Sequence, residues 1–444
     1  MNFINDAVNY ILSFKAYVML PMLMFIICMI IRMKVTKALT HCITLGIGFI
    51  GIFIVFDYFV GKIGTVIESI VKSTGSSMNV LDVGWPPMAA ITWSFKLAPL
   101  MILIIIGVNI VMLLFKLTST VNIDIWNYWH FIFTSQLVYF ITSNILLAIA
   151  AGIAAMILTV KLGDWSAERV AKISGLKGIS ITTLSGQAYY PIGIIMDKIM
   201  NHIPGLNKVN ANPENIKKRL GFFGEPMFIG LVMGAGLGIA AGYNVKDVFD
   251  LAFSIAAVVF ILPRMCSILG EGLMPISDGA KAYILKKFPS MKNAYIGMDL
   301  AVLVGNPAAV VTGILLMPVA LVLALILPGV RFIPLGDLPN LIGATVLIVV
   351  ACRGNVIRSI IASIPVIIGK LYVASAMADT YTTLAQKANF SVKGYNGTIT
   401  SFLDGGNLLR TWFAFLFSGK LWAVLLLIII IPVILYTRKV SKAE

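Results

Sequence analysis

Charged residues are scarce in this chain of 444 residues, and cysteine and histidine are scarcer still. Only 12% of the residues are charged, where a soluble globular protein has about 25%. The four cysteines and three histidines lack CxxC or Cys/His spacing, so we expect neither a disulfide framework nor a metal site, and no cofactor. The shortage of charge instead indicates a protein that lies in the lipid bilayer.

Long apolar runs take the place of the missing charge. Hydrophobic residues make up 59% of the sequence, in runs that are long and do not alternate. This pattern excludes a β-barrel and predicts an all-α polytopic membrane protein with about 11 transmembrane helices. A net charge of +15 would suggest nucleic acid in a soluble chain. Here the positive net charge is explained by lysine and arginine in cytoplasmic loops, so we expect no nucleic-acid partner. The same distribution predicts an N-terminus outside and a C-terminus in the cytoplasm.

The hydrophobic runs and basic clusters divide the chain into five predicted segments. They are a first repeat at 1–162 with about five spans and an interrupted hairpin near 82–95, a basic cytoplasmic region at 163–220, a second repeat at 221–377 with about five spans and a hairpin near 296–310, a polar extracellular excursion at 378–410, and a last span with a cytoplasmic tail at 411–444.

The two interruptions resemble each other. Asp82-Val-Gly-Trp-Pro-Pro and Asp299 with Val304-Gly-Asn-Pro each place a carboxylate and a Gly-x-Pro break in apolar sequence. An aspartate at the centre of a membrane helix costs about 2.5–3.5 kcal/mol, and broken backbone at that depth is tolerated only inside protein or beside a polar cavity. Because an odd number of spans separates the copies, we expect two inverted repeats, each with a re-entrant hairpin that faces one binding site. Asp82, before the first hairpin, is expected nearer the surface than Asp299.

Three stretches resemble a known family. They are Gly224-Glu-Pro-Met-Phe-Ile-Gly230, Val83-Gly-Trp-Pro-Pro-Met88, and Asp299 with Val304–Pro307. Together they look like the galactitol-type enzyme IIC of the bacterial phosphoenolpyruvate-dependent phosphotransferase system and, more distantly, the ascorbate type. The resemblance implies a homodimeric permease of the bacterial cell membrane, with a scaffold and a mobile core that carries a sugar alcohol such as galactitol by an elevator-like, alternating-access movement. It also implies that a separate enzyme IIB, supplied by enzyme IIA, phosphorylates the sugar, so this chain has no catalytic residue of its own and its standing as an enzyme is open.

The resemblance also suggests site residues. Asp299 falls where the ascorbate type has a substrate-binding aspartate, Gly84 and Trp85 fall on a Thr-Tyr pair, His130 matches a site histidine, and Thr134 replaces a glutamine. A His-Gln pair of that group is absent here, and Thr182, Thr183 and Gln187 are the nearest polar residues. From the residues themselves, Asn306 offers a donor and an acceptor, and Glu225 begins a helix where an acid is favoured. The predicted substrate-binding residues are therefore Asp299, Asn306, Gly84, Trp85, His130, Thr134, Thr183, Gln187 and Glu225.

Other interpretations remain for these residues and for the chain. Asp299 could also be a paired acid in the protein interior, and Trp85 could serve ordinary packing. His130 could be an anchor at the membrane interface, because it lies within an aromatic stretch. An ion-coupled secondary transporter would use the same fold with Asp299 as the coupling site. A membrane scaffold without transport is disfavoured, because its buried polar breaks would be costly without a purpose.

Overall fold

The computed structural model is mostly helical and describes residues 16–74, 78–220, 222, 225–287, 294–334, 336–388, 390 and 397–443. The helices in chain order are α2 (Ala16–Ile30), α3 (Val35–Thr74), α4 (Trp85–Trp93), α5 (Ala98–Leu114), η1 (Ile125–Tyr128), α6 (Trp129–Thr142), α7 (Ile145–Ser174), α8 (Leu184–Gln187), α9 (Tyr190–Asn201), η2 (Leu206–Lys208), α10 (Pro213–Leu220), α11 (Pro226–Ala240), α12 (Val245–Lys287), α13 (Ala301–Val304), α14 (Pro307–Ile326), η4 (Leu338–Asn340), α15 (Leu341–Ala351), α16 (Val356–Ala376), α17 (Ala378–Lys387), α18 (Leu408–Phe417), α19 (Leu421–Leu425) and α20 (Leu427–Lys442).

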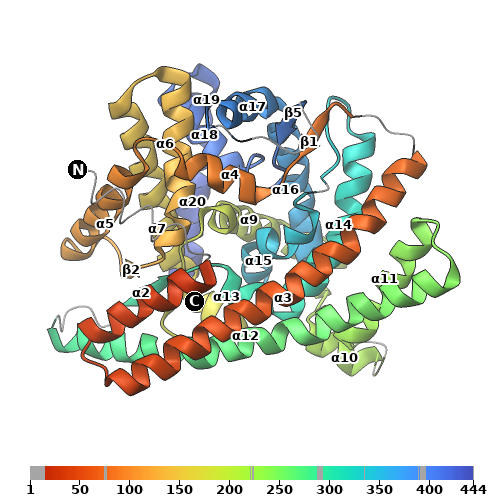
Figure 1. The fold of residues 1–444 in the computed structure, drawn as a ribbon, viewed down its shortest axis with the longest axis horizontal. Helices are drawn as coiled ribbons and strands as arrows, with labels where there is room; N and C mark the ends of the chain where they lie inside the picture. The colour runs from red at the N-terminus through yellow and green to blue at the C-terminus, as the bar shows by residue number, and fades with distance from the viewer. Residues whose placement is uncertain are drawn as a thin grey trace.

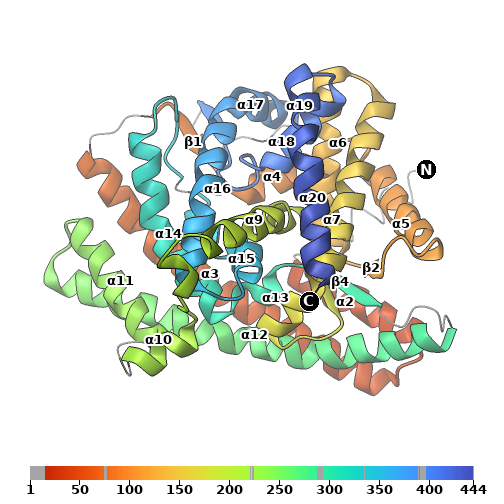
Figure 2. The same ribbon diagram turned by 180° about the vertical axis from the view of Figure 1, so that it is seen from behind.

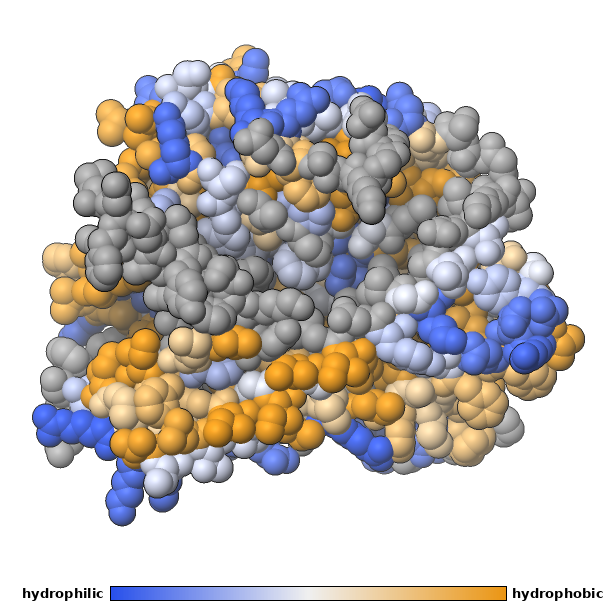
Figure 3. Space-filling model, viewed as in Figure 1, coloured by the Kyte–Doolittle hydropathy of each residue, from blue (hydrophilic) through white to orange (hydrophobic). Residues whose placement is uncertain are grey.

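The long helices α3 and α12 lie side by side along one face, and the remaining helices gather on one side of them (Figures 1 and 2). Close contact between the two is possible because Gly272 of α12 has no side chain. A Cβ there would lie 2.5 Å from the backbone nitrogen of Leu45 in α3. Apolar side chains cover the outer surface along α2 and α3 (Figure 3), including exposed Ile26, Ile43 and Ile47. Such a surface suits lipid or another protein rather than water.

Within the described ranges, four helices are long and apolar enough to cross a membrane. These are Ile145–Ser174, Pro307–Ile326, Val356–Ala376 and Leu421–Lys442. The pair Pro87–Trp93 and Ala98–Leu114 passes the same test but bends by 90° at its break, as a re-entrant hairpin would. This supports a membrane protein with several apolar helices, while the number of about 11 spans stays a prediction.

Five short strands correct the prediction of an all-α chain. They form a two-stranded sheet of β1 (Val80–Asp82) with β5 (Thr398–Thr400), and a three-stranded sheet in the order β2 (Thr120–Asn122), β4 (Tyr295–Met298), β3 (Ile179–Ile181). All pairings are parallel, and each joins segments far apart in the sequence. Runs of three or four residues inside apolar sequence carry no alternation that separates strand from helix, which is why the prediction missed them.

The two halves of the chain share an order of elements. In each half a helix pair (α2–α3, α11–α12) is followed by a strand with an aspartate at or directly after its end (β1, β4), a short helix (α4, α13) and a longer helix (α5, α14). A polar turn then opens a 3-10 helix and two further helices, which are η1, α6 and α7 in the first half and η4, α15 and α16 in the second.

Two segments predicted to be polar contain buried stretches. In the basic region 163–220, α7 continues without a break to Ser174, and residues 179–194 that follow are largely buried. In the excursion 378–410, every residue of 398–410 but Thr398, Leu408 and Leu409 is buried. In both places polar residues that serve the interior were interpreted as solvent-facing.

Candidate functional site

The segments at and after the ends of the five strands carry several of the buried polar residues. Because the strands of each sheet are parallel, their carboxyl ends meet at one edge of that sheet, where ligands of open parallel sheets commonly bind. The residues concerned are Asp82 and Trp85 after β1, Asp124, Asn127 and His130 after β2, Thr183 and Ser185 after β3, Asp299 after β4, and Asp404, Asn407 and Arg410 after β5.

Asp299 and Asp124 form a carboxylate pair around one amide. Asn127 Nδ2 donates to Asp299 Oδ2 and to Asp124 Oδ2, at 2.6 Å in each case. Asp299 Oδ1 accepts the backbone N–H of Ala301 at 2.7 Å, which fixes the turn that opens α13. Asp124 Oδ1 is buried and has no hydrogen-bond partner among the described atoms. The pair therefore keeps acceptor capacity that a donor could use.

The same turn occurs near the first hairpin, but there the carboxylates are saturated. Asp82 Oδ1 accepts the N–H groups of Gly84 and Phe402, and Oδ2 accepts those of Gly336 and Asp337, at 3.0–3.2 Å. Asp337 in turn accepts from Trp85 N, Leu403 N and Ser401 Oγ. Asp82 is only 5% exposed, so the expectation that it lies nearer the surface is wrong. This pair holds backbone together and has no acceptor left for a ligand.

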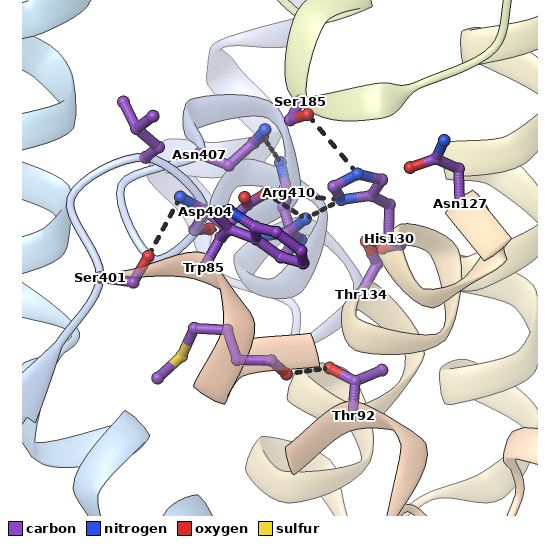
Figure 4. A network of polar contacts seen from close by, with 12 residues as sticks. Trp85, Thr92, Asn127, His130, Thr134, Ser185, Ser401, Asp404, Asn407 and Arg410 are labelled. Carbon is purple, nitrogen blue, oxygen red and sulfur yellow. Dashed lines mark hydrogen bonds and ion pairs between the residues drawn. The ribbon is translucent and has the colours of Figure 1, made fainter. Parts of the chain in front are cut away.

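His130, Asp404 and Arg410, here called the His130 cluster, join α6 to the segment after β5 (Figure 4). Arg410 is fully buried, and its Nη2 lies 2.8 Å from His130 Nδ1 and 3.2 Å from Asp404 Oδ1. Burying a guanidinium is tolerated when a carboxylate pairs with it, and Asp404 supplies that charge. Ser185 Oγ lies on the other side of the ring, 3.5 Å from His130 Nε2.

The contact with Arg410 sets the tautomer of His130. Asp404 Oδ1 also lies near Nδ1, at 3.4 Å, but the guanidinium is closer and has only donors to offer. Nδ1 must therefore accept, and the ring proton sits on Nε2. The 3.5 Å contact of Nε2 with Ser185 is weak, so this N–H is available to an incoming oxygen.

Aromatic rings surround the cluster. Trp129 lies against the His130 ring at a centroid distance of 4.0 Å, and half-buried Trp85 stacks on Trp129 at 6.5 Å with an interplanar angle of 28°. The Arg410 guanidinium lies 4.6 Å from the centroid of Phe133. In Figure 4 the Trp85 side chain lies in front of Arg410 and Asp404. Flat apolar faces beside polar groups suit a ligand with a carbon backbone and many hydroxyls.

The segment between β5 and α18 is held in place from two helices. Lys370 of α16 donates to the carbonyl of Leu403 at 2.7 Å, and Tyr381 of α17 donates to that of Gly405 at 2.6 Å. Asn407 caps α18 by accepting the N–H of Arg410 at 2.9 Å. Asn407 Nδ2, Arg410 Nε, Asn122 Nδ2 and Gln187 Oε1 are nevertheless buried with no hydrogen-bond partner among the described atoms. Buried polar atoms without partners are uncommon, and several in one region indicate a site that a ligand completes.

The structure brings some of the predicted residues together. Trp85, His130 and Thr134 lie in one group, with Thr134 Oγ1 donating to the carbonyl of His130 at 3.0 Å. Thr183 Oγ1 accepts the N–H of Leu300, next to Asp299, at 3.0 Å. Gln187 is buried and donates to Ser166 and to the carbonyl of Ile181.

Two predicted residues lie elsewhere. Asn306 caps α14, accepting from Ala308 and Ala309, and donates to the carbonyl of Ile173, so its amide fixes the start of α14 against α7. Glu225 starts α11, which packs against α12 and α14 on the far side of the molecule from α6 and α18 (Figure 1). Its helix-starting position was expected, but its place in the site is not supported.

Five residues of the site were missed by sequence reasoning: Asp124, Asn127, Asp404, Asn407 and Arg410. One signal was present, because Asp124-Ile-Trp-Asn127 and Asp337-Leu-Pro-Asn340 share an Asp-x-x-Asn spacing, and in both the asparagine amide donates to the aspartate. Among described residues, no three His, Cys, Asp or Glu side chains are grouped to hold a metal ion.

Gly84 is predicted to be irreplaceable at the first hairpin. Its φ is +74°, and a Cβ there would lie 2.8 Å from the carbonyl oxygen of Gly336. Left-handed backbone costs a residue with a Cβ about 1–2 kcal/mol, and the contact adds to that. Gly84→Ala should therefore lower the melting temperature of purified protein. Gly107→Ala, in open space within α5, is the control and should leave it unchanged or raised; equal melting temperatures for both variants would contradict this account.

Comparison with known proteins agrees with this architecture. Residues 10–394 match the family described as "PTS system sugar-specific permease component". The chain is 35% identical to a "Putative permease IIC component" of Escherichia coli (strain K12), over 98% of this chain and 100% of that protein. It is 33% identical to the galactitol-specific EIIC components of the phosphotransferase system of Escherichia coli strains K12 and O157:H7, over 92% of this chain and 90% of each relative.

Proposed function

We propose, from the premise that this chain belongs to the sugar-specific permease components of the phosphotransferase system, that it binds a sugar alcohol such as galactitol and carries it across the cell membrane. The family makes it a membrane protein and implies cooperation with EIIB and EIIA components. One observation carries the choice of site: the segments after all five strands supply buried polar groups, several of them without partners, next to stacked tryptophans.

The chemistry of these groups suits an uncharged polyol. Every hydroxyl both donates and accepts, so its site needs both kinds of partner. Asp299 and Asp124 would accept hydroxyl hydrogens, while His130 Nε2, Asn407 Nδ2 and Arg410 would donate. Trp85 would cover the carbon face of the ligand. One of the relatives is named for galactitol, which is why this hexitol is the first substrate to test.

The transport mechanism rests on the shared order of elements in the two halves. We propose that these are inverted repeats, that the chain has about 11 spans with the N-terminus outside and the C-terminus in the cytoplasm, and that it forms a homodimer. A mobile core with the two hairpins would then move the sugar past a scaffold in an elevator-like cycle. The long pair α3 and α12 and its apolar outer surface are suited to the scaffold.

The phosphoryl group would come from a partner. A phosphate-carrying cysteine has to be an accessible thiolate in electropositive surroundings. The cysteines whose side chains the structure describes, Cys28, Cys42 and Cys352, are buried among apolar residues, while the side chain of Cys266 lies outside the described part. The chain would therefore present the sugar, and enzyme IIB would phosphorylate it during uptake.

A second candidate is an ion-coupled transporter of a polar solute. The observation that favours it is the pair Asp299 and Asp124, whose oxygens lie on either side of one amide and would attract a cation. Asp299 would then be the coupling site rather than a sugar ligand.

Uptake by right-side-out membrane vesicles decides between the two functions. Vesicles that contain the protein receive radiolabelled galactitol, with phosphoenolpyruvate and the soluble phosphotransfer proteins inside. We expect sugar phosphate to accumulate, to depend on enzyme IIB, and to persist when proton and sodium gradients are dissipated. Free sugar that accumulates only with an ion gradient would contradict the proposal and favour the second candidate.

A further inference from the structure

Asp124 differs from the other buried aspartates that the structure describes. Two of those accept four uncharged donors each, and two pair with a buried arginine; they are Asp82 and Asp337, and Asp197 and Asp404 with Arg358 and Arg410. Asp124 is only 1% exposed, yet its side chain accepts one described hydrogen bond, from the amide of Asn127. Its Oδ1 has no partner among the described atoms. A buried carboxylate with so few donors is costly, so it indicates a position that a ligand completes.

The neighbouring carboxylate makes the shortage of donors greater. Asp299 is half-buried and accepts from the same Asn127 amide, so two carboxylates share one uncharged donor group. Among the residues with described side chains, no lysine or arginine forms an ion pair with either aspartate. Two carboxylates this close can hold one proton between them, which neutralises only one of the two. At least one negative charge therefore stays without a cation.

This charge lies within the candidate sugar site. Asn127, which holds the two carboxylates, comes three residues before His130, and Figure 4 shows both side chains in the same group. Trp129 lies between them in the sequence and stacks with Trp85, which would cover the polyol. A polyol held against these rings has one end near the carboxylate pair.

From this arrangement we propose that Asp124 and Asp299 set the charge selectivity of the sugar site. The pair admits neutral polyols, favours polyols that carry a protonated amine, and excludes polyols that carry a carboxylate. The proposal rests on the proposed function, because it assumes that this site binds a polyol.

The chemistry of the three ligand classes explains the order. An ammonium group brings three donors and a positive charge, and hydrogen bonds between charged groups are about twice as strong as neutral ones. A hydroxyl brings one donor and no charge. A ligand carboxylate has only acceptors, so it leaves Asp124 Oδ1 without a partner, and it is repelled by the pair in surroundings of low dielectric constant.

Calorimetric titration of the purified full-length protein at about pH 7 tests the proposal. The probes are galactitol, 1-amino-1-deoxygalactitol, galactarate and ammonium chloride. The first three share one carbon chain and differ only at its ends, and galactarate has a carboxylate at both ends, so it cannot turn its charge away from the pair. We expect the amine to bind about tenfold more tightly than galactitol and galactarate to bind about a hundredfold more weakly.

Asp124→Asn tests the residue itself. The asparagine oxygen can keep the hydrogen bond from Asn127, and its amide takes the place of the unpartnered Oδ1, so no described contact is lost. The ratio of the affinities for the amine and for galactitol should fall about tenfold. A purely structural role would weaken both ligands alike and leave this ratio unchanged. Asp379→Asn, which removes the charge of an exposed aspartate paired with Arg331, is the control and should keep the ratio of the wild type.

The arms of the experiment separate the possible outcomes. An amine that binds no more tightly than galactitol, galactarate that binds as tightly as galactitol, or an unchanged ratio in Asp124→Asn would each overturn the proposal. Ammonium that binds as tightly as the amine would show that a cation alone is recognised, which also overturns it. If the wild type binds galactitol without preference for charge, this inference fails while the proposed function stands; if it binds none of the four probes, both fail.

Discussion

Replacing Asp299 by asparagine should lower the affinity for galactitol about ten- to a hundredfold. The substitution keeps the volume but removes the charge, and it turns an acceptor into a group that also donates. Hydrogen bonds to charged groups contribute about 1.5–3 kcal/mol, which corresponds to that change in affinity. Asp299→Ala should bind more weakly still, because sugar hydroxyls would be buried without partners. Calorimetry on purified protein measures both variants.

The structure also shows how a stability effect can be kept apart from a binding effect at this position. Asp299 Oδ1 holds the turn through Ala301 N, and an asparagine oxygen can do the same. Asp299→Asn can therefore keep the turn, but its new amide group would face Asn127 Nδ2, so it should lower the melting temperature less than Asp299→Ala, which loses both contacts. Normal affinity in both variants together with a lower melting temperature would show that this carboxylate is structural and would remove the main support for the sugar site.

Replacing Asp82 should have its effect on stability. Its two oxygens accept four backbone N–H groups, and Asp82→Asn would point an amide group at two of them. Each buried donor left without an acceptor costs about 1–3 kcal/mol, so the variant should lose about 2–6 kcal/mol or fail to fold. Thermal unfolding in detergent measures the loss.

A matched control is available on the surface. Asp379 pairs with Arg331 at 3.1 Å, but its side chain is 72% exposed. Exposed pairs of this kind contribute little, so Asp379→Asn should melt close to the wild type. An Asp82→Asn protein with a normal melting temperature and weak galactitol binding would instead place Asp82 in the sugar site.

Gly and Pro marked both interruptions in the sequence at residue level, and the structure has a strand end followed by a helix start at each of them. Asp82, Gly84 and Pro86, like Asp299, Gly305 and Pro307, lie where a strand ends and a helix restarts. Trp85 and His130 were reached through the family resemblance rather than through periodicity, and the structure brings them together by way of Trp129. Breaks in apolar sequence are local signals, so they can be predicted from the sequence alone.

The rest depended on contacts that no local signal carries. Asp404 and Arg410 were assigned to a solvent-facing excursion, because charged residues are expected there unless their partners are known. Arg410 is buried since Asp404 neutralises it and His130 accepts from it, 280 residues away. The first repeat was predicted to end at residue 162, whereas Asp164 pairs with Lys161 at 3.0 Å and α7 continues to Ser174.

The pairing of β1 with β5 has a consequence for how the chain is made. Asp82 is bound in part by the N–H of Phe402, which is 320 residues further along the chain. At about 5–20 residues per second, synthesis of that interval takes tens of seconds. For most of this time Asp82 lacks three of its four donors, because Gly336 and Asp337 also follow it by more than 250 residues. The turn after β1 can therefore complete its hydrogen bonds only when synthesis of the chain is nearly finished.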